Sequence, residues 1–260
     1  MMYGVMDKWT REQIIIAYRL YCETPFGQIH SRNPQIIDVA NILERSPNAL
    51  AMKMSNLASF DSLIIQSGRK GLKNASKLDK KIVEEFEGDW EKLFDLSEEI
   101  ISNMAFSKPF ENLKDMSEYE EGFPRVTEQE RIVKTRRNQD FFRKSILSNY
   151  SSKCCITGLS DKRLLIASHI VPWHRDEKNR LNPRNGVCLS VLHDKAFDQG
   201  LITILPDWRI RVAATLRKNT SSAFLSSSIL SLEGQRINLP EKFAPDSTFL
   251  EYHNNNIFLD

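Results

Sequence analysis

The pattern of apolar residues changes near the middle of the chain, and this change limits the folds that the chain can adopt. Apolar side chains recur at helical spacing through most of residues 10–59. In the second half they form short β-like runs bounded by turn residues, at 164–166, 186–190, 201–205 and 209–213. We therefore predict an α+β protein, in which an all-helical N-terminal domain precedes a C-terminal domain with short strands.

Capping signals place the starts of three predicted helices in the N-terminal domain. A capping box at Thr10 precedes a helix over about 10–23. An asparagine or serine followed by proline opens two more helices, over about 34–44 and 47–59. The turn between these two is short, so they could form a helix-turn-helix that contacts DNA. The alternative is a hairpin of helices that only pack, because Lys53 is the only basic residue on the second helix.

Charge is separated along the chain, although the formal net charge is only +2. Residues 69–81 carry six basic side chains and one acidic one, and residues 131–153 carry seven and one. Residues 84–121 carry thirteen acidic side chains and three basic ones. Such separation can present basic faces to a polyanion such as DNA, but solvated helix faces produce the same pattern.

Proline, glycine and polar residues suggest where the chain divides. Residues 84–128 are typical of an acidic helix followed by a linker. We expect a helical DNA-recognition domain at 1–115, a linker at 116–137 and a second domain at 138–260. The second domain would open with an amphipathic helix over about 138–151.

Composition narrows the class of protein. Hydrophobic residues make up 41% and charged residues 27% of the chain, which is ordinary for a globular protein. No stretch approaches the roughly 18 apolar residues of a membrane span, and the first residues lack the order of a secretory signal. The four cysteines do not suggest a disulfide framework. We expect a cytoplasmic protein with reduced thiols and no contact with a membrane.

One segment of the second domain combines histidine and asparagine with short strands and a helix. His169 ends the first predicted strand, Asn185 opens the second, and His193 lies at the start of a short helix. Between these three residues lie 15 and 7 others. With its surroundings, this segment resembles the HNH endonuclease family, whose active site is a ββα-metal finger, and most closely its restriction-endonuclease branch.

The resemblance covers about residues 130–260. The stretches that carry it are Arg137-Asn138-Gln139, Phe142-Arg143, Tyr150, the Cys-x-x-Thr-Gly at 154–158, Phe197 to Leu201, and Leu239-Pro240 with Leu250 and His253. A lone set of two histidines and one asparagine would be weak support. The flanking stretches imply that the second domain is an HNH ββα-metal domain.

The resemblance implies a role for each residue of the motif. His169 would be the general base that activates water, a task that suits a neutral imidazole. Asn185 would tie the loop and hold the orientation of His169, although in some ββα-metal enzymes an asparagine here binds metal. His193 would bind one divalent cation per active site, Mg²⁺ or Mn²⁺, which stabilises charge on the scissile phosphate and the leaving oxygen.

The chain departs from the family in its metal ligands. Many HNH enzymes have Asp or His just before the general base, where this chain has Ser168. Asp194 or Asp198 could supply the missing oxygen, and we prefer Asp198 because it belongs to a recurring Phe-Asp-x-Gly; alternatively it only caps a turn. Many relatives also hold a structural zinc with two Cys-x-x-Cys pairs. Each pair here keeps one thiol, so we expect no structural zinc.

Together these features predict a divalent-metal-dependent DNA endonuclease that acts in restriction or defence. The finger would grip the backbone of double-stranded DNA, and the helical domain would supply base contacts. Because a double-strand cut needs two active sites, we expect a homodimer. The candidate DNA-contacting residues are Arg137, Arg143, Arg175, Arg184 and Lys53. The alternative is a non-catalytic DNA-binding regulator that uses the helix-turn-helix and keeps a degenerate HNH scaffold.

Overall fold

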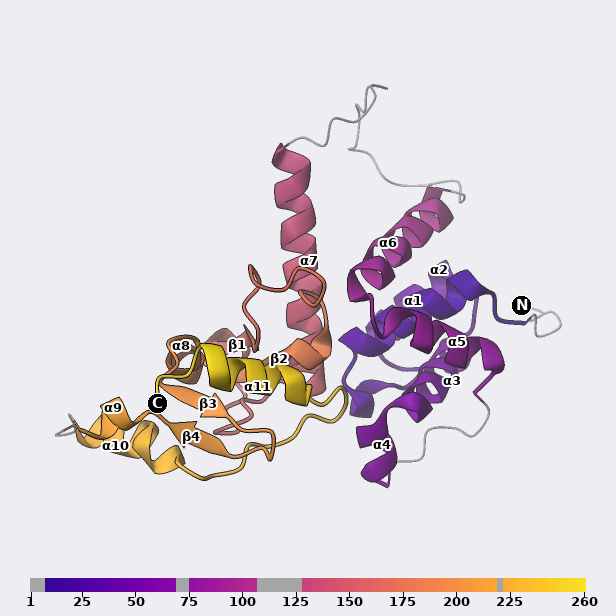
Figure 1. The fold of residues 1–260 in the computed structure, drawn as a ribbon. Helices are drawn as coiled ribbons and strands as arrows, with labels where there is room; N and C mark the ends of the chain where they lie inside the picture. Colours follow the sequence, from indigo (N-terminus) through magenta and orange to yellow (C-terminus); the bar gives the residue numbers. More distant parts are fainter. Residues whose placement is uncertain (1–7, 69–74, 107–127, 219–221) are drawn as a thin grey trace.

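The computed structural model describes residues 8–68, 75–106, 128–218 and 222–260, and it confirms the α+β class. In Figure 1 the N-terminal helices, in indigo and magenta, lie on one side of the molecule, and the strands near residues 202–212, in orange, lie on the other. The described helices include none with the length and apolar character needed to cross a membrane.

The N-terminal helices begin where the capping signals predict. α1 (Arg11–Glu23) follows the capping box of Thr10, and α2 (Pro34–Ile42) and α3 (Pro47–Leu57) follow capping side chains and open with proline. Three further helices complete this region: α4 (Ser62–Gln66), α5 (Lys77–Phe86) and α6 (Trp90–Phe106). α1 is the central helix, because it packs against α3, α5 and α6 and because all its residues from 14 to 18 are buried.

α5 has no counterpart among the predicted helices. It begins with a capping box formed by Ser76 and Asp79. Asp79 is fully buried, and its carboxylate oxygens lie 2.8 and 3.0 Å from Nζ of Lys53. Lys53 is itself only 6% exposed, so its predicted contact with DNA is wrong. The α2–α3 pair packs as a helical hairpin whose second helix has no other basic side chain.

Replacing Lys53 with alanine is expected to lower the free energy of unfolding by about 3–5 kcal/mol, because the Asp79 carboxylate stays buried without its cation. The matched control is Lys80→Ala. Lys80 forms an exposed ion pair with Glu84 at 3.5 Å, and such a pair is worth at most about 1 kcal/mol. Urea unfolding followed by circular dichroism compares the two variants. Equal stabilities, with weaker DNA binding by Lys53→Ala alone, would contradict the buried-pair assignment.

α7 (Glu128–Asn149) begins earlier than the helix predicted over 138–151. Residues 128–137 of the predicted linker are therefore helical, and residues 116–127 of that linker lie outside the described part of the chain. α7 packs against α1 and α6, and the rings of Phe94 in α6 and Phe141 in α7 lie 5.2 Å apart. The hydrophobic core thus continues from the N-terminal helices into the C-terminal half of the chain, and the predicted division into two domains stays a prediction.

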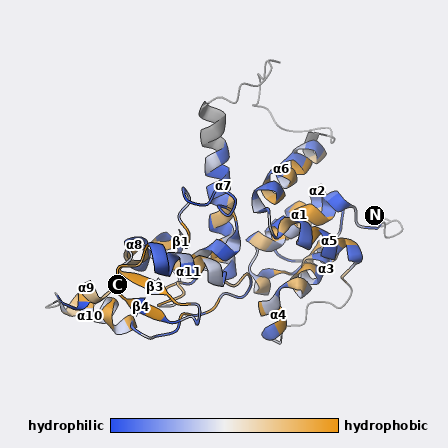
Figure 2. Ribbon diagram, in the orientation of Figure 1, coloured by the Kyte–Doolittle hydropathy of each residue, from blue (hydrophilic) through white to orange (hydrophobic). Residues whose placement is uncertain are grey.

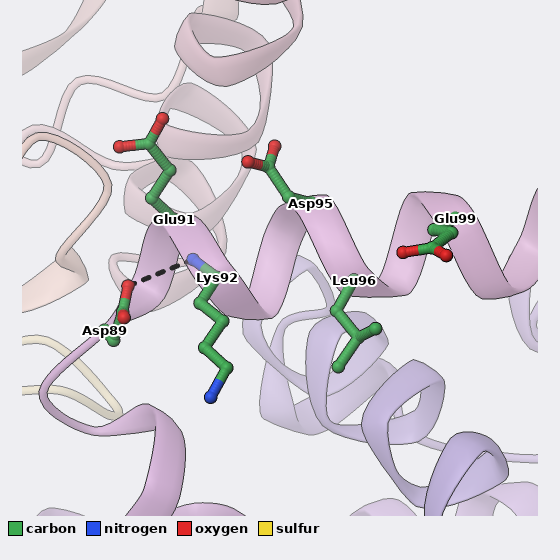
Figure 3. A pocket seen from close by; sticks show the side chains of 6 residues that line it. All are labelled: Asp89, Glu91, Lys92, Asp95, Leu96 and Glu99. Carbon is green, nitrogen blue, oxygen red and sulfur yellow. Dashed lines mark hydrogen bonds between the residues drawn. The ribbon is translucent and has the colours of Figure 1, made fainter.

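Acidic and basic segments that are separate in the sequence meet between α6 and α7. Nζ of Lys134 lies 3.3 Å from Glu91 and 2.9 Å from Asp95, and Arg137 pairs with Glu98. Figure 3 shows Glu91 and Asp95 on α6, where they line a pocket of about 460 Å³. Part of the basic charge of α7 is therefore neutralised within the molecule and is not offered to a polyanion.

The C-terminal half of the chain contains two antiparallel strand pairs within the described residues. β1 (Leu165–His169) pairs with β2 (Gly186–Ser190), and His169 lies opposite Gly186. β3 (Ile202–Ile204) and β4 (Ile210–Val212) form the predicted hairpin. α8 (Val191–Asp198) follows β2 directly and packs against β1, β2 and β3. β1, β2 and α8 therefore have the ββα order that the resemblance implies.

The C-terminal part of the chain packs around the hairpin. α9 (Ala214–Arg217) and α10 (Ala223–Ser228) follow β4, and α11 (Ser247–Asn256) packs against β3. Figure 2 shows both hairpin strands as hydrophobic. Their isoleucine and valine side chains are buried, so the hairpin adds to the same core.

Candidate active site

The end of β1 and one face of α8 border a cavity of about 270 Å³. Ser168 and His169 line it from β1, Asp194 and Asp198 from α8, and Trp173 from the loop after β1. The two aspartates are four residues apart, so they lie on the same face of the helix. The cavity thus brings together one imidazole, one hydroxyl and two carboxylates.

His169 is held by ring contacts and by one hydrogen bond. Its ring stacks on Phe142 of α7, with centroids 3.7 Å apart and planes at 10°, and it meets Trp173 edge-on at 5.5 Å. Nε2 lies 2.9 Å from the carbonyl oxygen of Arg180. Because a carbonyl only accepts, Nε2 carries the proton of the neutral ring, and Nδ1 keeps its lone pair. Burial lowers the pKa of His169 to about 4, although the Arg180 carbonyl raises it. The ring is therefore neutral at pH 7.

Asn185 joins the two ends of the loop between β1 and β2. It ends a short 3₁₀ helix (Pro183–Asn185) and is 1% exposed. Its Oδ1 accepts the amide of Val171 at 2.8 Å, and its Nδ2 donates to the carbonyl oxygens of Val171 and Asn179, both at 3.2 Å. This position fits the loop-tying role better than metal binding, and a role in catalysis stays a prediction.

His193 does not face the cavity at His169, which corrects its assignment as a metal ligand and catalytic residue. It is 4% exposed, and its Nδ1 and Nε2 lie 2.7 Å from Ser190 Oγ and 3.1 Å from the carbonyl oxygen of Ser228. Burial lowers the pKa of His193, but hydrogen bonds with Cys154 and Ser228 outweigh this and raise it. Successive helical residues point about 100° apart, so His193 and Asp194 occupy different faces of α8.

Asp194 and Asp198 are the carboxylates of the cavity, and both have raised pKa values. Burial raises the pKa of Asp194, against a smaller lowering by the Ser168 hydroxyl and Lys195. Burial and then the charge of Asp194 raise the pKa of Asp198. The Ser168 hydroxyl is buried and lies near Asp194, but it makes no hydrogen bond within ordinary limits. The cavity thus contains hydroxyl and carboxylate oxygens, and nearby groups offset the negative charge of the carboxylates only in part.

This donor set fits a hard divalent cation. Within the described residues, no three His, Cys, Asp or Glu side chains converge as a metal site, so protein ligands would come from Asp194 and Asp198. Mg²⁺ is commonly held by one or two carboxylates while water and substrate phosphate complete its coordination. Asp194 and Asp198 both line the cavity and His193 does not, and the role of Asp198 as a metal ligand stays a prediction.

The five predicted DNA-contacting residues differ in how available they are. Lys53 and Arg137 are paired as described above. Arg143 donates to two backbone carbonyl oxygens next to β1, at 2.9 and 3.2 Å, and Arg184 pairs with a glutamate at 3.3 Å. Arg175 is exposed in the loop after His169, and its side chain has no partner within the described ranges. Of the five, Arg175 is the best placed to contact phosphate.

Two residues that support His169 had no assigned role. Phe142 stacks on its ring, and it belongs to a stretch that carried the family resemblance without a stated function. Arg180 donates to the carbonyl oxygen of Trp173 at 2.9 Å, and its guanidinium lies 5.3 Å from the Trp173 ring centroid. Because the Arg180 carbonyl also accepts from His169, this arginine orders the loop around the imidazole.

Replacing Gly186 with alanine is expected to slow any reaction that uses His169 by about tenfold or more and to cost about 1–3 kcal/mol of stability. A Cβ at this position would lie 2.7 Å from Cζ of Phe142 and 2.5 Å from Cδ1 of Ile146, so Phe142 must move away from the imidazole. The matched control is Gly27→Ala, where a Cβ meets no atom within 4 Å. Chemical unfolding and initial rates compare the variants, and unchanged rates in both would exclude a role for the stacking.

Comparison with known proteins matches one part of the chain. Residues 154–205 fit the family model of an HNH endonuclease. This segment includes all of β1, β2 and α8, and therefore His169 and both aspartates. No curated protein matches the chain.

Proposed function

We propose that the protein is a divalent-metal-dependent endonuclease that hydrolyses phosphodiester bonds in DNA, because residues 154–205 match the family model of an HNH endonuclease. One observation carries the proposal: a neutral imidazole and two carboxylates line the same cavity. The proposed products carry 5′-phosphate and 3′-hydroxyl ends.

His169 acts as the general base in the proposed reaction. The Arg180 carbonyl holds the proton on Nε2, so Nδ1 of the neutral ring accepts a proton from the attacking water. Phe142 and Trp173 restrict the ring, and Asn185 keeps the loop that carries Arg180 closed against β2. The loop and α7 thus orient the base before substrate arrives.

Asp194 and Asp198 hold the proposed cation. When bound, a divalent ion stabilises negative charge on the scissile phosphate and on the leaving oxygen. The two aspartates lie on one face of α8, and burial raises their pKa values more than the neighbouring Lys195 lowers them. Arg175, on the exposed loop after His169, contacts a neighbouring phosphate.

A double-strand cut requires two such sites, which is the reason to propose a homodimer on double-stranded DNA. The proposed setting is restriction or defence in the cytoplasm. The N-terminal helices recognise the substrate, because a finger that grips the backbone reads little sequence. The competing idea, a non-catalytic regulator, loses support because the basic residue of its recognition helix is buried against Asp79.

The proposal is tested with supercoiled plasmid DNA and a long linear DNA of known sequence. Mg²⁺- or Mn²⁺-dependent conversion of the plasmid to nicked or linear forms, abolished by EDTA, is the expected result. Sequencing of the ends from the linear DNA reports specificity and end chemistry. Intact DNA across several divalent metals and substrate sequences would overturn the proposal.

A further inference from the structure

A second cavity lies elsewhere in the nuclease domain and shares no lining residue with the one at His169. Its volume is about 380 Å³. It lies between the end of α7, the turn formed by residues 154–158 and the segment 238–241. The residues at issue among those that line it are Asn149, Tyr150 and Cys154.

Cys154 differs from the other three cysteines of the chain. Its Sγ accepts the backbone N–H of Ser190 at 3.3 Å. Burial raises the pKa of Cys154, but hydrogen bonds from His193, from the Thr157 hydroxyl and from the amides of the turn outweigh this and lower it to about 6. The other three cysteines are also buried, and burial raises their pKa values. Cys154 is the only one of the four whose hydrogen-bond donors outweigh burial and so favour a thiolate.

The wall beside Cys154 carries polar atoms without partners. Asn149 is 0% exposed and Tyr150 is 6% exposed. Both amide atoms of Asn149 and the hydroxyl of Tyr150 are buried and make no hydrogen bond. Because buried polar groups are nearly always hydrogen-bonded, this wall suits a small molecule that both donates and accepts hydrogen bonds.

We propose that Cys154 is an oxidation site for hydrogen peroxide or a similarly small hydroperoxide, which enters through the cavity beside Asn149 and Tyr150. The thiolate sulfur attacks one peroxide oxygen, an S–O bond forms and the O–O bond breaks. The sulfur is oxidised to sulfenic acid, the peroxide is reduced, and the departing hydroxide takes a proton from solvent. Hydrogen peroxide is small enough to enter this cavity. Its hydroxyl groups can donate hydrogen bonds to, and accept them from, the carboxamide of Asn149 and the phenol of Tyr150.

Oxidation at this position would reach the nuclease site through α8, a consequence that rests on the proposed function. Sγ contacts Ser190, which caps α8, and His193, which precedes Asp194. Oxidation replaces the thiolate with a sulfenic acid, whose sulfur is a weaker acceptor of the hydrogen bonds from Ser190 and His193. The start of the helix that carries Asp194 and Asp198 would shift, and DNA cleavage would slow.

The test is peroxide treatment of the full chain, trapping of sulfenic acid with dimedone, and mass spectrometry of cysteine peptides. Cys154 is expected to be labelled at least about tenfold faster than the other three cysteines, which serve as internal controls. Labelling of Cys154 no faster than the others, or only in urea, would overturn the proposal.

A variant of the cavity wall tests the entry route. Asn149→Leu removes the unpartnered carboxamide and is expected to slow labelling of Cys154 several-fold while leaving labelling of the other cysteines unchanged. Unchanged labelling at Cys154 would reject the cavity as the route. Cleavage is measured in parallel: a peroxide-treated enzyme that loses activity and regains it with thiol reductant supports the link to α8. If the untreated protein never cuts DNA, the proposed function fails, and the labelling still decides the oxidation site.

Discussion

His169→Ala is expected to lower the rate of DNA cleavage by roughly 10²–10⁴-fold, the range that a positioned general base contributes. The substitution removes the imidazole that lines the cavity with Asp194 and Asp198. Single-turnover cleavage of a linear DNA at saturating metal measures the loss. His30→Ala is the matched control, because His30 is exposed and lies in the N-terminal region. Equal rates for the two variants would exclude His169 as the base.

On the acid side of the pH–rate profile, the rate of DNA cleavage is expected to fall at a lower pH than it would if the base had the pKa of a free histidine. His169 is an active base only when neutral, and burial lowers its pKa to about 4 from the ordinary 6.5. Loss of activity on acidification should therefore have its midpoint well below pH 6.5. The lowered pKa also means that His169 contributes stability above pH 6.5 that is lost as pH falls towards 4. Unfolding measured at each pH separates the two effects, and a midpoint at 6.5 in fully folded enzyme would contradict the burial of His169.

Short sequence signals predicted the helices and strands whose formation depends on interactions between residues close together in the sequence. The caps at Thr10 and before Pro34 and Pro47 act within one helical turn, so sequence alone locates the first three helices. The hairpin of β3 and β4 likewise follows from its turn residues and its short apolar runs. His169 and Asn185 could be placed at the ends of the loop between β1 and β2, because short β-like runs lie on both sides of that loop.

The predictions that failed all depend on contacts between residues distant in the sequence, or on the direction in which a side chain points from its helix. Lys53 looked available to DNA, but its partner Asp79 lies 26 residues away on a helix that was not predicted. The basic residues of α7 meet acids of α6, across a stretch of sequence that no periodicity connects. His193 matched the family by residue type, yet neighbouring residues on a helix point in different directions, and Asp194 takes the face at the cavity.

Substitution of the two aspartates that line the cavity gives the sharpest test of the proposed metal site. Asp194→Asn and Asp198→Asn are each expected to raise the Mg²⁺ concentration for half-maximal cleavage by at least about tenfold, since even the loss of an outer-shell partner costs roughly that much. The double variant should not respond to Mg²⁺ at all. Asp38→Asn is the matched control, because Asp38 is exposed on α2.

Stability measurements on the same variants test whether Asp194 and Asp198 hold the cation, and they do not require the protein to cleave DNA. Raised pKa values mean that the folded state disfavours both charges. Without metal, neutral asparagine should therefore leave the melting temperature unchanged or raise it. With Mg²⁺, wild-type protein should gain stability by binding, and the double variant should not. A double variant that Mg²⁺ still stabilises as it does the wild type would place the cation elsewhere and remove α8 from the proposed metal site.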